Sequence, residues 1–100
     1  MANRYLSVMN HSTGFLHPGA MGSPVAATCS GQRWWVGHRR SAASRRRADA
    51  VGLRDAGTLA ELVERVDTIV SVCPPSSALD VARTVASTGF GGIYIDANAV

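Results

Sequence analysis

The chain has no lysine, only two cysteines and no long apolar run. No apolar stretch approaches the roughly 20 residues of a membrane span. The first residues also lack the apolar region of a signal peptide, so we expect a cytoplasmic protein without membrane contact. Cys29 and Cys73 stand alone, without metal-ligand spacing, and are expected to be reduced apolar fillers. The sequence therefore predicts neither a metal site nor a disulfide framework.

The composition, with 46% hydrophobic and 17% charged residues, is typical of a globular protein. The length of 100 residues predicts one domain. All ten basic residues are arginines, and the net charge is +3. Seven arginines lie between Arg33 and Arg54, a cluster that suits nucleic acid, a phosphate-bearing cofactor or a solvated helix face. Nucleic acid is disfavoured, because the arginines are neither interleaved with aromatics nor set in a helix-turn-helix.

Strands and helices alternate along the chain through short loops. Strands are predicted at 13–16, 33–36, 53–56, 68–73 and 93–96; helices at 20–30, 41–51 and 59–66, and from Ser76 or Ser77 onward. Residues 1–11 are expected to be a disordered or frayed lead-in, and 12–100 one domain. This alternation predicts an α/β, Rossmann-like, doubly wound parallel sheet in three α/β/α layers, with strand order 3-2-1-4-5.

Local signals support several of these elements. Thr58 and Glu61 form the T-x-x-E pattern of a capping box, in which each side chain satisfies the other residue's backbone N–H. The segment 68–73 is rich in β-branched residues, as in a strand buried on both faces. The helix at 41–51 has a modest apolar face of Ala43, Ala50 and Val51, and the run 45–47 is expected to be solvent-exposed.

The first strand leads directly into a glycine-containing turn and a helix. The residues at the spacing of a G-x-G-x-x-G motif are His17, Pro18, Gly19, Ala20, Met21 and Gly22. A helix that starts after a strand directs free N–H groups at a pyrophosphate, Gly19 allows close approach of the phosphates, and Gly22 allows tight packing. The alternative is that both glycines serve only turn and packing needs.

Other segments converge on the same edge of the predicted sheet. Arg39, Arg40 and Ser41 follow the second strand, where no acid occurs between Gln32 and Ala48. An acid there favours NAD, whereas guanidinium and hydroxyl groups suit the 2′-phosphate of NADP, so we expect NADP, with NAD as the alternative. The segment Cys73, Pro74 and Pro75 is expected beside the nicotinamide ribose, and Asp96 and Asn98 on the substrate side.

With these motifs, the chain resembles the N-terminal domain of the 6-phosphogluconate dehydrogenase and 3-hydroxyisobutyrate (β-hydroxyacid) dehydrogenase family. The resemblance rests on 14–22, close to G-x-I-G-x-G-x-M-G, on Arg40-Ser41, on 67–75, and on 96–99 at the place of D-x-S-T. It implies an NAD(P)-binding domain of an oxidoreductase acting on a small hydroxy acid or phosphorylated sugar acid. His17 in place of glycine, and Asn98-Ala99 in place of Ser-Thr, depart from the pattern.

The resemblance also implies that a lysine and further substrate contacts come from a following helical domain. Because this chain has no lysine and ends inside the substrate motif, we expect cofactor capture only, without a catalytic residue. The sheet edge after Tyr94 is expected to be exposed, which favours self-association or cover by the missing helical domain. The alternatives are a non-catalytic nucleotide-binding or regulatory module and an arginine-rich nucleic-acid binder.

Overall fold

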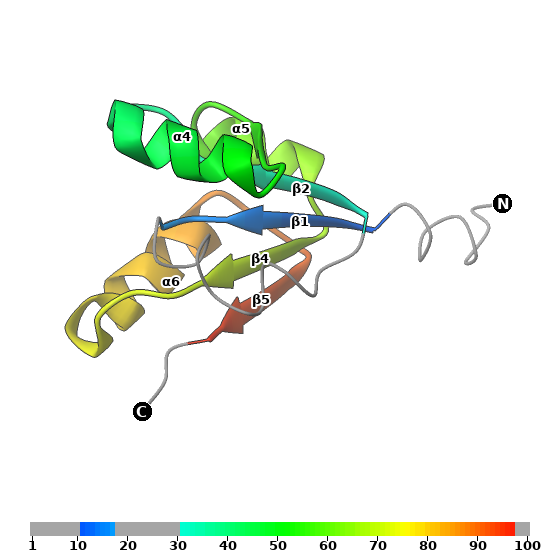
Figure 1. The fold of residues 1–100 in the computed structure, drawn as a ribbon. Helices are drawn as coiled ribbons and strands as arrows, with labels where there is room; N and C mark the ends of the chain where they lie inside the picture. The colour runs from blue at the N-terminus through cyan, green and yellow to red at the C-terminus, as the bar shows by residue number, and fades with distance from the viewer. Residues whose placement is uncertain (1–10, 18–30, 98–100) are drawn as a thin grey trace, which may run out of the picture.

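Five strands form a single parallel sheet in the computed structural model, which describes residues 11–17 and 31–97 (Figure 1). The strands are β1 (Ser12–Phe15), β2 (Gln32–Trp35), β3 (Arg54–Asp55), β4 (Thr68–Ser71) and β5 (Ile93–Asp96). Their order is β3-β2-β1-β4-β5 and every pairing is parallel, which confirms the predicted Rossmann-like α/β fold. Residues 1–10 of the expected 1–11 lead-in and the expected helix at 20–30 lie outside the described residues, whereas the His11 carbonyl accepts from the Gln32 N–H at 3.0 Å.

The helices in the described ranges are α4 (Ala42–Ala50), α5 (Leu59–Arg65) and α6 (Ala78–Ser87), the last preceded by a 3-10 turn, η1 (Pro75–Ser77). Ser41 caps α4, since its hydroxyl oxygen accepts from the Ser44 N–H at 3.2 Å. Thr58 caps α5 by accepting from the Glu61 N–H at 3.3 Å. The Glu61 carboxylate, however, accepts from the Thr58 hydroxyl rather than from a backbone N–H, so the capping box is one-sided.

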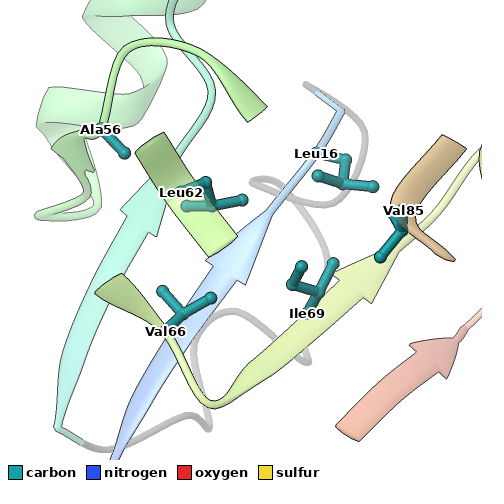
Figure 2. Close-up of a cluster of buried hydrophobic side chains, with 6 residues drawn as sticks. All are labelled: Leu16, Ala56, Leu62, Val66, Ile69 and Val85. Atoms are coloured by element: carbon teal, nitrogen blue, oxygen red, sulfur yellow. The ribbon is translucent and has the colours of Figure 1, made fainter. Parts of the chain in front are cut away.

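Apolar side chains alternate along the strands and form one cluster on each face of the sheet. Phe15, Trp35, Ala48, Leu53 and Val70 pack on the face covered by α4. Leu16, Ala56, Leu62, Val66, Ile69 and Val85 pack beneath α5 and α6 on the other face (Figure 2). The described helices therefore lie on both faces, which gives the predicted three layers (Figure 1).

The predicted apolar face of α4 is wrong. Ala43, Ala50 and Val51 are exposed, whereas Ser44 and Ala48, one helical turn apart, are buried against the sheet. Ser44 can be buried because its hydroxyl is hydrogen-bonded to Ser41. In a helix of alanine, serine and arginine, small size therefore decides which residues meet the sheet, and apolar periodicity does not reveal them.

The central and outer strands differ as the sequence predicts. All four residues of β4 are buried, although the strand ends at Ser71 rather than Cys73. β3 and β5 form the two edges, and β5 leaves Ile93 and Ile95 exposed. No helix in the described ranges is long and apolar enough to cross a membrane.

Candidate nucleotide site at the carboxyl edge of the sheet

Because all the strands are parallel, their carboxyl ends lie along one edge, where ligands bind in open α/β sheets. The chain order reverses between β1 and β4, the neighbours at the centre of the sheet. The predicted phosphate-binding residues Pro18, Gly19, Ala20, Met21 and Gly22 lie outside the described residues, as does Asn98. The described part of the site consists of His17 and the segments that follow β2, β4 and β5.

A pocket of about 250 Å³ opens at this edge beside β1 and β2. Its apolar wall is formed by Leu16, Val36, Leu59, Val81 and Val85, and its polar groups belong to His17, Arg40, Asp80 and Thr84. These residues come from the ends of β1 and β2 and from α5 and α6, so the pocket continues the apolar cluster on that face. An apolar wall with a few polar groups beside it is typical of small-molecule sites.

His17 lies directly beyond β1 and lines the pocket. Its Nε2 atom is buried and finds no hydrogen-bond partner among the described residues. Burial first, and the positive charge of Arg40 second, lower the pKa of His17 below its ordinary value of 6.5. The imidazole is therefore neutral at pH 7, with a buried nitrogen that a ligand could satisfy.

Arg40 reaches the pocket because the loop after β2 folds back toward β1. The Arg40 N–H donates to the Gly37 carbonyl at 3.1 Å, and Arg39 closes the turn in the left-handed region, at φ 61°. From this turn the Arg40 guanidinium donates through Nη2 to the carbonyl of Leu16, at 3.1 Å. The loop after β2 thus carries a half-buried cation to the end of β1.

A carboxylate that the sequence did not single out holds this loop in place. Asp55 accepts from the N–H groups of Gly37 and Gly57, at 3.1 and 2.8 Å, and pairs with Arg45 at 2.7 Å. Arg45 also donates to the Gly37 carbonyl at 2.7 Å. Desolvation tends to raise the pKa of Asp55, but the bonds from Gly57, Arg45 and Gly37 together outweigh it and lower that pKa below 3.8. Arg45 is exposed, as predicted for the run 45–47, and its guanidinium also holds the loop after β2 through Asp55 and Gly37.

The structure separates the other predicted residues from the pocket wall. Arg39 is exposed, and the Ser41 hydroxyl is engaged in capping α4, so neither lines the pocket. Cys73, Pro74 and Pro75 follow β4, with the Ser71 hydroxyl 3.8 Å from the Cys73 sulfur. Asp96 pairs in register with Ser71 at the end of β5. The candidate site therefore has two parts, the pocket beside β1 and β2 and the rim beyond β4 and β5.

Asp80 and Thr84 are pocket residues that the sequence analysis did not identify. They are four residues apart on α6, and Thr84 also bonds within the helix through Oγ1 to the Asp80 carbonyl, at 2.8 Å. Val81 and Val85 lie four residues apart on the same helix, and the polar residues beside them were the available signal. The described ranges contain no group of three or more His, Cys, Asp or Glu side chains that could hold a metal ion.

A scan against protein-family models finds no match, and no curated protein sequence matches the chain. Function is therefore inferred from the strand order, the pocket and the charges around it.

Proposed function

We propose that this chain binds a nicotinamide dinucleotide, NADP(H) in preference to NAD(H), as the cofactor domain of a 6-phosphogluconate or β-hydroxyacid dehydrogenase-like oxidoreductase. One observation carries the proposal. An apolar pocket lies at the carboxyl ends of β1 and β2, with Arg40 and His17 on its wall, and the buried Nε2 of His17 has no partner among the described residues. This is the edge at which parallel α/β sheets bind dinucleotides, and both side chains suit a phosphate.

The size and polarity of the pocket fit the adenosine part of the cofactor. Its volume of about 250 Å³ lies below the roughly 300–1,000 Å³ of pockets that enclose a whole drug-sized ligand. The apolar wall can accept the face of an adenine ring, with Asp80 as an acceptor for an exocyclic amine. The rest of a dinucleotide would extend toward Cys73, Pro74, Pro75 and Asp96, beyond β4 and β5.

The preference for NADP(H) rests on the charges near the end of β2. Arg40 is held at the pocket, and Arg39 is exposed in the same turn. No acid follows β2 within this loop, and the Asp55 carboxylate beside it is engaged with Gly37, Gly57 and Arg45 rather than offered to the ribose 2′-hydroxyl that marks NAD(H). A guanidinium binds a phosphate through paired, charge-assisted hydrogen bonds.

When bound, the nicotinamide ring would supply the hydride chemistry, and this chain would bind and orient the cofactor. The chain contains no lysine, and the resemblance implies that the catalytic lysine belongs to a helical domain. A non-catalytic nucleotide-binding module would use the same pocket. Separate assays of binding, and of hydroxy-acid oxidation with a helical partner domain added, distinguish the two.

Titration of the purified chain with NADPH and NADH, by calorimetry and thermal shift, tests the proposal. We expect NADPH to bind more tightly, and Arg40→Ala to weaken NADPH by about tenfold or more while changing NADH less. Arg46→Ala is the matched control, because it removes an exposed arginine of α4 that does not line the pocket. Since Arg40 also bonds to Leu16, the melting temperature of each variant is measured without ligand.

Two results would contradict the proposal. If neither coenzyme shifts the melting temperature or protects backbone amides from exchange at millimolar concentration, the chain does not bind nicotinamide dinucleotides. If duplex DNA binds instead, with a steep dependence on salt, the arginine cluster serves nucleic acid. Against that outcome, two arginines of the 33–54 cluster already have partners within the chain, because Arg45 pairs with Asp55 and Arg54 lies over the ring of Trp34 at 5.6 Å.

A further inference from the structure

Strand β5 presents an apolar, unprotected edge. Among the described strands it pairs with β4 alone, and Ile93 and Ile95 are 62% and 42% exposed. Edge strands of soluble proteins are usually protected by lysine, proline, a bulge or very short length. The four residues of β5, Ile93–Asp96, contain no lysine or proline, and their one charged side chain, Asp96, stands at the end of the strand. An edge of this kind is a template for pairing with another strand.

The hydrogen bonds of β5 show which backbone groups face outward. The N–H groups of Ile93 and Ala97 donate to β4 and the residue before it, at the carbonyls of Asp67 and Ser71, both at 2.9 Å. Because backbone groups alternate in direction along a strand, the N–H and C=O of Tyr94 point away from β4. Tyr94 therefore lies at the middle of the outer edge and is the natural centre for pairing.

We propose that β5 pairs antiparallel with β5 of a second copy of this chain, with Tyr94 opposite Tyr94 and the two-fold axis perpendicular to the sheet. The two tyrosines then exchange both backbone hydrogen bonds. In this register Ile93 of each copy lies opposite Ile95 of the other, in pairs without backbone bonds, where side chains approach most closely. The two sheets become one continuous sheet of ten strands.

A second copy is the occupant that this edge fits, because the edge is complementary to itself. The exposed isoleucines of the two copies cover one another on one face, while the half-buried Tyr94 side chains meet on the other. Asp96 lies opposite Gly92, so the two carboxylates do not oppose each other. A register centred on Ile95 would instead place Ile93 opposite Ala97 and Tyr94 opposite Asp96, and would pair less apolar surface.

The predicted dimer is weak and depends on concentration. A four-residue strand spans only about 13 Å, so the paired edges bury less than the roughly 1,200–2,000 Å² of stable complexes. We therefore expect a monomer–dimer equilibrium in the micromolar range. The proposal does not depend on nucleotide binding, since the pocket is lined by β1, β2, α5 and α6.

Sedimentation velocity of the intact chain, from micromolar to millimolar concentration, tests the dimer. Ile93→Lys and Ile95→Glu are each expected to weaken it by about tenfold or more, because each buries unpaired charges. The double variant is expected to dimerise again, because the register places each lysine opposite a glutamate of the other copy. Leu79→Lys is the control, since Leu79 is an equally exposed apolar residue (60%) on α6 rather than on β5.

A covalent readout tests the register independently of these charges. Tyr94→Cys, in a chain with Cys29→Ser and Cys73→Ser, should form a disulfide dimer on mild oxidation, since opposed bonded residues lie about 5.5 Å apart between Cα atoms. A monomeric wild-type chain at every concentration would overturn the proposal. So would unchanged dimerisation of both single variants. If the singles fail to dimerise and the double variant does not recover, the register is wrong.

Discussion

The sheet extends from its central strand β1 in two directions, and the two sides end in different kinds of edge. On the β2–β3 side the edge strand has two residues, and the Asp55–Arg45 pair ties the loop after β2 to the end of β3. On the β4–β5 side the edge strand has four residues and exposes two isoleucines. The first side is closed by side chains of this chain, whereas the second, in the described part of the chain, ends at a strand that pairs with β4 alone. Arg40, which lines the proposed cofactor pocket, belongs to the loop that Asp55 and Arg45 hold.

The largest expected effect tests whether the two sides fold as one unit. Leu62 of α5 is fully buried at the centre of its cluster, directly over Gly14 of β1 (Figure 2). Leu62→Ala should lower the free energy of unfolding by about 2–5 kcal/mol, a large part of the total for a domain of this size. If the fold is one unit, amide exchange in β2 and β5 accelerates together. Faster exchange in β5 alone would show that the two sides unfold separately.

The elements that the sequence predicted well are those with a strong local signal. The strand order, the burial of β4 and the cap at Thr58 follow from alternation, β-branched residues and a capping side chain. His17 and Arg40 were predicted to share one site, and they do line one pocket.

What the sequence did not predict depends on tertiary contacts. No local pattern brings Asp55 to Arg45 and Gly37, because β2 and β3 must first pair. In the same way, Asp80 and Thr84 become pocket residues only when α6 packs beside the ends of β1 and β2. Periodicity reports which face of a helix is apolar, and it carries no information on which polar neighbours share a pocket.

Removing the Asp55 carboxylate should loosen the β2–β3 side of the sheet, where it holds the loop after β2. Asp55→Ala leaves the N–H groups of Gly37 and Gly57 and the Arg45 guanidinium without this acceptor. We expect the free energy of unfolding to fall by about 1–2 kcal/mol. This is near the low end for the loss of three hydrogen bonds, because the pair with Arg45 is partly exposed and screened by solvent. Chemical denaturation measures the loss, with Glu64→Ala as an exposed control that should stay within about 0.5 kcal/mol of wild type.

The same variant has a defined pH signature. The pKa of Asp55 is lower in the folded chain than its ordinary value of 3.8. The contribution of the Asp55 charge to the free energy of unfolding is therefore fully present above about pH 3.8. The contribution is lost as the pH falls through the lower, folded pKa. Wild type and Asp55→Ala should therefore converge in stability in strong acid. A constant difference at all pH values would mean that the side chain acts through packing rather than charge.

The helix starts allow a finer comparison of the two sides. α4 begins with a side-chain cap from Ser41, whereas Ser77, at the start of α6, makes no capping hydrogen bond. Ser41→Ala should therefore destabilise the chain by about 1 kcal/mol, and Ser77→Ala by less than about 0.5 kcal/mol. Thermal unfolding of the two variants measures the difference. Equal destabilisation of the two variants would mean that the Ser41 cap adds no stability to the β2–β3 side.

The smallest effect concerns His17, where the pocket meets solvent. Its pKa is lowered in the free chain, so the unfolded state binds the proton more readily and stability falls as the pH drops below about 6.5.

A bound phosphate beside the imidazole would raise the pKa of His17 again, so cofactor binding should take up a proton. Affinity for NADH should then rise a few-fold from about pH 7.5 to about 6, and His17→Gln should remove this dependence. NADH is the better probe than NADPH, because the 2′-phosphate itself titrates near pH 6. Calorimetry in buffers of different ionisation enthalpy counts the protons directly. If binding of NADH takes up no proton in the wild-type chain, the proposed contact between His17 and the cofactor phosphates is wrong.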